Sequence, residues 1–178
     1  MALVSTVGPL FWPPAEISDG TPSFSNMLLD ANDEKAAAII EVPKAGNIRK
    51  IHFRTGTVTT GDTVDVRVET LDATGHPSGT LFGTTTNGSQ TILLTEDNTW
   101  FTTTLTADAT VVAGDKIALV VALPSVAVGN LNIVKLTNAG KQLGNAYTDL
   151  YTGSYTKDFS IKPCVAVEYS DGSFAYTY

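Results

Sequence analysis

The sequence is poor in positive charge. It has 11 lysine and arginine residues against 18 aspartate and glutamate residues, which gives a formal net charge of −7. The basic residues are scattered along the chain rather than clustered. Nucleic acids and anionic membrane surfaces attract proteins through clustered cations. We therefore expect neither a nucleic acid nor a membrane among the partners of this protein.

Cysteine is almost absent as well. Cys164 is the single cysteine, so no disulfide can form within the chain. It lies in the alternating run IKPCVAVEY, and no neighbouring motif would activate its thiol as a nucleophile. We expect Cys164 to be a small buried apolar residue.

Long apolar runs are also missing. No stretch approaches the roughly 18 apolar residues that a membrane-spanning helix requires. The opening MALVSTVGPLFWPP lacks the basic start of a secretory signal, and glycine and proline interrupt it. These absences predict a protein made and kept in a cytoplasm unless it leaves by another route, of which assembly into a virus particle is one.

Short alternating runs dominate what is present. In TVDVRVETL, Val64, Val66 and Val68 fall on one face of a strand, and Asp65 and Arg67 fall on the other. We therefore expect Val66→Asp to unfold the protein and Arg67→Asp to be tolerated. Similar runs of about five to eight residues follow one another, separated by turn residues, and no amphipathic helix is evident. The pattern predicts an all-β fold, an antiparallel β-sandwich of the jelly-roll type, with a closed barrel as the alternative.

The predicted strands begin only at residue 36. Residues 1–35 contain prolines and the turn-like SDGTPS, which predicts an irregular N-terminal arm, and residues 36–178 form the sandwich domain. The arm carries Leu10, Phe11 and Trp12, and this much apolar surface indicates a contact. We expect the arm to mediate protein contact in a homo-oligomer, with a trimer as one candidate, or to attach to another protein. The alternative is that the arm covers an open end of its own sandwich.

A segment with loop composition, residues 72–79, joins two of the predicted strands. Gly75 and Gly79 tolerate positive φ, and Pro77 restrains His76. No second histidine, cysteine or carboxylate lies at a metal-ligand spacing from His76. The hairpin is therefore predicted to close a sheet rather than to carry a site.

Two stretches resemble a known module. VDVRVETLDATGHPSGTLFG and, further along, TWFTTTLTADATVVAGDKIALVVA are similar to a β-sandwich module of tailed-bacteriophage virion proteins. Similar modules occur in secreted carbohydrate-associated proteins, and GPLFWPPAEISDGTPSF looks like the start of long phage structural proteins. The resemblance implies a non-enzymatic virion component, namely a head decoration, fibre or tail accessory protein. Such a protein is assembled in the host cytoplasm, binds other virion proteins and mediates particle assembly or surface attachment.

Catalytic and metal-binding patterns are weak. The chain has 18 acids and two histidines but no G-x-S-x-G nucleophile motif, and the resemblance supplies no catalytic residue. DANDE, at residues 30–34, offers oxygen ligands for calcium, but the distal glutamate and glycine of an EF-hand are missing. We predict no enzyme, no catalytic residue, no cofactor and no metal.

A carbohydrate-binding, lectin-like module that recognises a host-surface glycan is the alternative function. Tyr147, Tyr151 and Tyr155 recur every four residues, which on a strand places them on one face. The intervening TGS predicts a turn, which leaves their common face open. Packing against a neighbour is the other interpretation of these tyrosines. Trp100 opens an alternating strand and is expected in the core.

Overall fold

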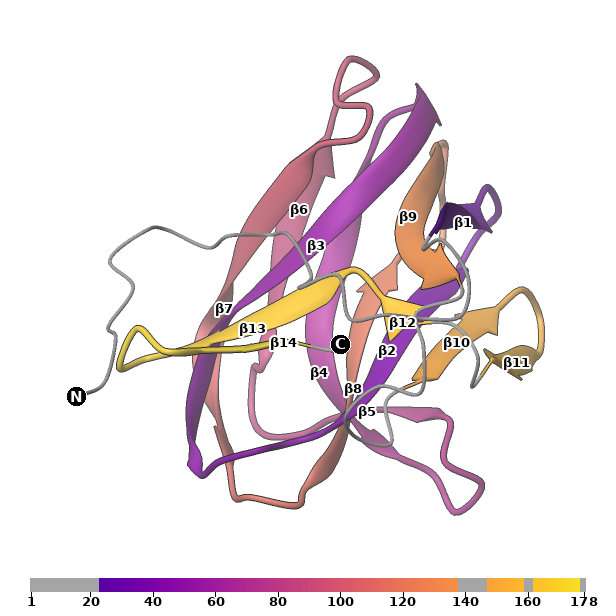
Figure 1. Cartoon of the computed structure of the whole chain (residues 1–178). Coiled ribbons are helices and arrows are strands. Elements are labelled where there is room, and N and C mark those ends of the chain that lie inside the picture. The colour runs from indigo at the N-terminus through magenta and orange to yellow at the C-terminus, as the bar shows by residue number, and fades with distance from the viewer. Residues whose placement is uncertain (1–22, 138–146, 159–161, 177–178) are drawn as a thin grey trace.

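A computed structural model describes residues 23–137, 147–158 and 162–176 (Figure 1). This part of the chain consists of strands joined by turns and contains no helix, and therefore none long and apolar enough to cross a membrane. The strands are β1 (Ser23–Leu29), β2 (Lys35–Glu41), β3 (Gly46–Thr60), β4 (Asp62–Leu71), β5 (Pro77–Leu81), β6 (Asn87–Ile92), β7 (Trp100–Val111), β8 (Lys116–Ala122), β9 (Asn130–Thr137), β10 (Tyr147–Tyr151), β11 (Tyr155–Asp158), β12 (Lys162–Pro163), β13 (Val165–Tyr169) and β14 (Phe174–Tyr176).

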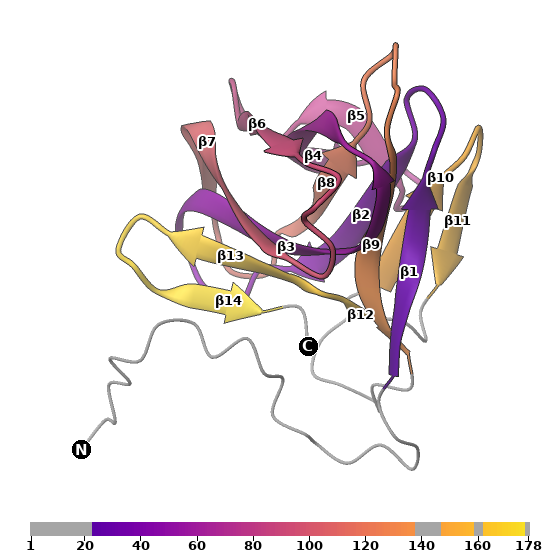
Figure 2. The ribbon, with the colours of Figure 1, turned by 90° about the horizontal axis from the view of Figure 1, so that it is seen from above.

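The strands form two curled antiparallel sheets that pack face to face (Figure 2). The first sheet has the order β1-β9-β3-β13-β14, with β7 paired to β3 and β12 paired to β9. The second has the order β11-β10-β2-β8-β4-β5, with β6 also paired to β4. The predicted all-β antiparallel sandwich is confirmed.

The core lies between the sheets and follows the predicted alternation. Val64, Val66 and Val68 on β4 are fully buried in it, as the period of two requires. Phe53 on β3 stacks against Phe101 on β7, with ring centroids 5.5 Å apart. This contact within the core joins two neighbouring strands of the first sheet.

Strand β3 runs the length of the first sheet. In its sequence the apolar residues Ile48 and Ile51 are three positions apart, which breaks strict alternation and predicts a bulge. Its pairing with β7 shifts register between Ile48 and Lys50, which confirms that prediction. The first half of β3 pairs with β13 and β7, and the second half pairs with β9. The bulge lets both Ile48 and Ile51 face the core although they are three residues apart.

Part of the predicted irregular arm is a strand. Residues 23–29 form β1, which pairs with β9 from Ser23–Thr137 to Leu29–Leu131. Met27 and Leu29 are buried in the core. The expectation of an irregular segment was wrong here because the strand is stabilised by a partner about 100 residues away. Leu10, Phe11 and Trp12 lie outside the described residues, and their role stays a prediction.

Two other local expectations need correction. The polar residues and glycine of TNGSQ, residues 86–90, predict a turn, but residues 87–90 begin strand β6. Trp100 does not enter the core between the sheets, because Phe101 takes the inward position; Trp100 packs partly buried against Val134 and Cys164. Cys164 is buried as expected, and burial raises the pKa of its thiol to about 12.

Candidate functional site

The outer face of the second sheet carries two fully buried carboxylates, those of Glu69 and Asp149. Antiparallel register arranges its outward side chains in three rows that cross the strands. Small side chains, Ala37, Ala118 and Ala122, occupy the middle of the face, and polar or aromatic residues flank them on β4 and on β10–β11. The rows are Glu69, Ala118, Ile39 and Tyr147; Arg67, Val120, Ala37, Asp149 and Lys157; and Asp65, Ala122, Lys35, Tyr151 and Tyr155.

The β4–β5 connection, residues 72–76 and here called the His76 loop, is shaped by one carboxylate. Asp72 Oδ1 accepts hydrogen bonds from the Thr74 amide (2.8 Å), the Thr74 hydroxyl (2.7 Å) and the His76 amide (3.0 Å). These hydrogen bonds, that of the Thr74 hydroxyl first, lower the pKa of Asp72. Gly75 has a φ of 81°, which a side chain would strain. The loop is thus specified locally.

The His76 loop docks on β10 and β11. His76 Nδ1 lies 2.6 Å from Asp149 Oδ2. The Tyr147 hydroxyl donates to the Gly75 carbonyl, and Lys157 Nζ donates to the Thr74 carbonyl. A hairpin that extends from β4 is therefore fastened to strands at the other side of the sheet.

Asp149 is the most enclosed member of this contact. Its side chain is fully buried, and its Oδ1 has no hydrogen-bond partner among the described residues. Burial raises the pKa of the Asp149 carboxyl although the hydrogen bond and the charge of His76 act in the opposite direction. An isolated carboxylate is costly to bury, and His76 compensates this one only in part.

The three predicted tyrosines do share one face, as their spacing indicates. Their rings nevertheless do not form one open platform. Tyr155 stacks on His76 (5.1 Å between centroids, 15° between planes) and meets Tyr151 at 4.8 Å and 54°. Tyr147 is buried beneath the His76 loop. Burial raises the pKa of Tyr155 and that of Tyr147.

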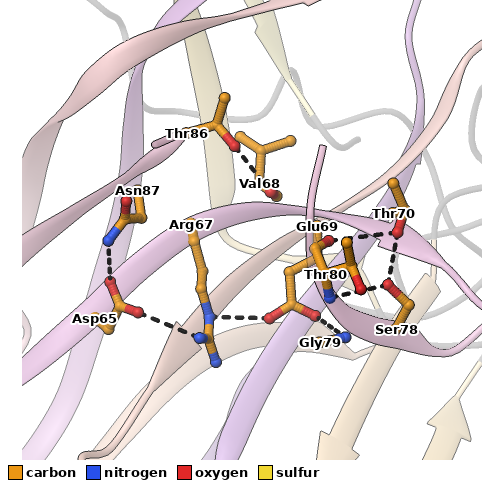
Figure 3. A network of polar contacts seen from close by, with 10 residues as sticks. All are labelled: Asp65, Arg67, Val68, Glu69, Thr70, Ser78, Gly79, Thr80, Thr86 and Asn87. Carbon is orange, nitrogen blue, oxygen red and sulfur yellow. Dashed lines mark hydrogen bonds and ion pairs between the residues drawn. The ribbon is translucent and has the colours of Figure 1, made fainter. Parts of the chain in front are cut away.

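A second buried carboxylate lies on β4 (Figure 3). Glu69 is fully buried; its Oε1 lies 2.9 Å from Arg67 Nε, and its Oε2 accepts the Gly79 amide hydrogen at 2.8 Å. Arg67 also pairs with Asp65 at 3.3 Å. The outward position predicted for Arg67 is correct, but its expected tolerance to Arg67→Asp is not supported, because Arg67 neutralises a buried acid.

The outer face of the first sheet carries a different group. His52 on β3 is buried; its Nε2 lies 3.2 Å from Glu168 Oε2 and its Nδ1 lies 2.9 Å from the Thr102 hydroxyl. Lys50 donates to the other oxygen of Glu168 at 2.8 Å. Phe174 lies against the His52 ring at 5.4 Å. Burial lowers the pKa of His52.

The remaining candidates for chemistry are used within the fold. In DANDE, Glu34 Oε2 accepts the amide hydrogens of Asp30 (2.6 Å) and Ala31 (3.0 Å), and Asn32 accepts that of Ala127. Within the described ranges, no three histidine, cysteine or acidic residues are grouped to hold a metal ion. These oxygen atoms therefore shape turns.

A pocket of about 160 Å³ lies beside the His76 loop. Ile39, Leu71 and Tyr147 supply apolar walls, and Lys116 and Lys157 supply positive charge. A cavity of about 150 Å³ holds a molecule of the size of benzene. The pocket is accordingly too small for a glycan chain.

The pairing of His76 with Asp149 could not be found from the sequence. The two residues are 73 positions apart, and nothing near either of them marks the other.

Comparison of the chain with protein-family models, with curated proteins and with solved structures finds no match.

Proposed function

We propose that this protein is a non-enzymatic structural component of a tailed-bacteriophage particle. It acts as a head decoration, fibre or tail accessory protein that contributes to particle assembly or surface attachment. The observation that carries the proposal is architectural: residues that resemble the phage module occupy positions that build the sandwich.

The hairpin within the resembling stretch supports this proposal most directly. Val64, Val66 and Val68 fill the core, and His76 binds the loop to β10. Gly75 takes a positive φ in the turn, and Gly79 takes one within β5. Each of these residue types meets a structural need at its own position. The same pattern would serve a module whose purpose is a rigid shape.

The alternative, a lectin-like module, has one observation in its favour. Tyr151 is partly exposed, and Lys35 Nζ lies 5.5 Å from its ring centroid, so an aromatic group and a hydrogen-bond donor stand together. Against it, Tyr155 is already packed between His76 and Tyr151. Tyr155 is also partly exposed, but its ring is stacked on His76, and Tyr147 is buried. A sugar would therefore not find the predicted set of three open rings, which favours the structural role.

The particle itself tests the proposal. Phage particles from a culture that produces this chain would be purified by density gradient and examined by mass spectrometry and cryo-electron microscopy. We expect the chain to co-purify in fixed stoichiometry and to fit density on the head or the tail. Particles that lack the chain would contradict the proposal.

A glycan array tests the alternative. The wild type, Tyr151→Ala and Thr106→Ala would be compared, since Thr106 is exposed on β7 of the other sheet and serves as a matched control. We expect no saturable binding from any of them. Binding that Tyr151→Ala abolishes and Thr106→Ala retains would establish the lectin-like function instead.

A further inference from the structure

Three connections meet at one end of the sandwich, the upper end in Figure 1. They are the β3–β4 turn (residues 60–62), the β6–β7 loop (93–99) and the β8–β9 loop (123–129). The register places them together, because Asp62 pairs with Ile92 and Thr60 pairs with Asn130. We call this surface the Asp62 end.

The Asp62 end exposes large apolar side chains. Leu93, Leu94, Val126 and Val128 are between 56% and 80% exposed. Only two other large hydrophobic residues in the described part of the chain, Leu28 and Val112, are comparably exposed. Single exposed apolar residues are common on proteins, but a concentration of them at one end indicates an interaction surface.

The loop that carries Val126 and Val128 is held in place. Asp62 Oδ2 accepts the amide hydrogens of Val128 (3.0 Å) and Gly129 (2.9 Å). Asn32 Oδ1 accepts that of Ala127 at 2.9 Å. The apolar side chains are thus displayed from a fixed backbone, which lowers the entropic cost of binding.

The β6–β7 loop, which carries Leu93 and Leu94, is also held in place by hydrogen bonds to carboxylates. Glu96 Oε2 accepts the Leu93 amide hydrogen at 2.6 Å, and Asp97 Oδ1 accepts that of Val58 at 2.6 Å. A Cβ on Gly61 would lie 3.1 Å from the Leu93 Cα and 2.3 Å from the Ile92 carbonyl oxygen. Glycine at this position therefore allows the loop and the turn to touch.

The charge of the Asp62 end is of one sign. The three connections contain Asp62, Glu96 and Asp97 and no lysine or arginine. The β1–β2 turn, whose Asp33 amide donates to the Pro124 carbonyl, adds Asp30 and Asp33 beside them. Arg54 approaches from β3, and its Nε donates to the Asn98 carbonyl at 3.3 Å. A binding partner would need apolar side chains for the aliphatic residues and positive charge around them.

We propose that the Asp62 end is a docking surface for a second protein that presents an apolar patch rimmed by lysine and arginine. The identity of this partner as another virion protein rests on the proposed function. An anionic membrane is disfavoured because the rim is acidic. A second copy docked end to end is disfavoured because two acidic rims would face each other.

Site-specific photo-cross-linking in the producing culture tests the docking surface. p-Benzoylphenylalanine would replace Val126 in the full chain, and the matched control would carry it at Val112, which is exposed in the β7–β8 turn at the opposite end. We expect at least a tenfold higher yield of one protein adduct from position 126. The cross-linked partner surface should contain lysine or arginine beside apolar residues, and added salt should lower the yield.

A pair of charge variants gives an independent measurement. Val126→Glu should reduce co-sedimentation of the purified chain with that partner at least tenfold, whereas Val112→Glu should leave it unchanged. Both side chains are solvent-exposed, so neither variant should unfold. Equal losses, or no loss from Val126→Glu, would overturn the proposal.

The outcomes separate the docking surface from the virion assignment. A chain absent from particles that still forms the adduct at position 126 would refute the virion role and keep the docking surface. A chain present in particles without such an adduct would refute the docking surface alone. Adducts confined to lipid, to a second copy of the chain, or equal at positions 126 and 112 would also refute it.

Discussion

The two outer faces of the sandwich each carry a histidine–carboxylate pair, but opposite members of the pairs are buried. On the first sheet the His52 side chain is 5% exposed and that of its partner Glu168 is 17% exposed. On the second sheet the Asp149 side chain is 0% exposed and that of its partner His76 is 24% exposed. The same two chemical groups therefore stand in reversed environments.

Because of this reversal, burial disfavours the charged form of the histidine on the first face and the charged form of the carboxylate on the second. Burial lowers the pKa of His52 because it disfavours the imidazolium, and it raises the pKa of Asp149 because it disfavours the carboxylate. Glu168 differs from Asp149: burial raises its pKa, but the hydrogen bonds from Lys50 and His52 prevail and the net shift is downward. A partly exposed carboxylate that is hydrogen-bonded to Lys50 and His52 is thus stabilised as an anion, whereas one enclosed beneath a loop is not.

The largest effect is expected at Glu69, the other buried acid on the outer face of the second sheet. Arg67→Asp would remove the partner of Glu69 and place a further carboxylate beside it. Breaking a buried pair in this way costs about 3–5 kcal/mol of the free energy of unfolding. Urea unfolding would measure the loss, with Thr106→Asp on the first sheet as an exposed control. A loss below about 1 kcal/mol would mean that Glu69 is solvated in solution.

A smaller loss should follow from opening the His76 loop. His76→Ala leaves Asp149 buried without its partner, and we expect a cost of about 2–3 kcal/mol, below that of a fully buried pair because His76 is partly exposed. The double variant His76→Ala/Asp149→Asn should recover part of this loss, as a double-mutant cycle would show. Additive effects of the two substitutions would contradict the coupling.

The pH dependence of Asp149 should have a definite sign. Because its pKa is raised in the folded protein, its contribution to stability is fully present below the ordinary value of 3.8 and is lost as the pH rises through the raised value. Relative to Asp149→Asn, the wild type should lose stability upward from about pH 3.8, with a slope no steeper than about 1.4 kcal/mol per pH unit. Parallel unfolding free energies for the two proteins would refute the burial of this charge.

The smallest effect concerns His52 and has the opposite direction. Its pKa is lowered in the folded protein, so the stability that it contributes is present above the ordinary value of 6.5 and is lost as the pH falls through the lowered value. We expect the wild type to lose stability relative to His52→Gln as the pH falls below about 6.5, with a slope no steeper than about 1.4 kcal/mol per pH unit. A relative gain on acidification would show that Glu168 controls the pair.

Local alternation in the sequence was sufficient to predict much of the fold. Successive side chains of a strand point to opposite faces, so the valines of TVDVRVETL predict both a strand and its buried side. The bulge near Ile48 and the common face of Tyr147 and Tyr151 follow from the same rule, whereas Tyr155 shares that face through its pairing with Tyr151 across the turn. These features depend on residues within a few positions of each other.

Tertiary structure alone decided the rest, because its stabilising contacts join residues far apart in the chain. Strand β1 exists through pairing with β9, and Arg67 faces outward as predicted yet neutralises a buried acid. Alternation specifies which face a side chain takes but not what covers that face. The burial of Asp149, and hence its pKa, depends on the His76 loop, which lies across the sheet and covers this carboxylate although His76 is 73 residues earlier in the chain.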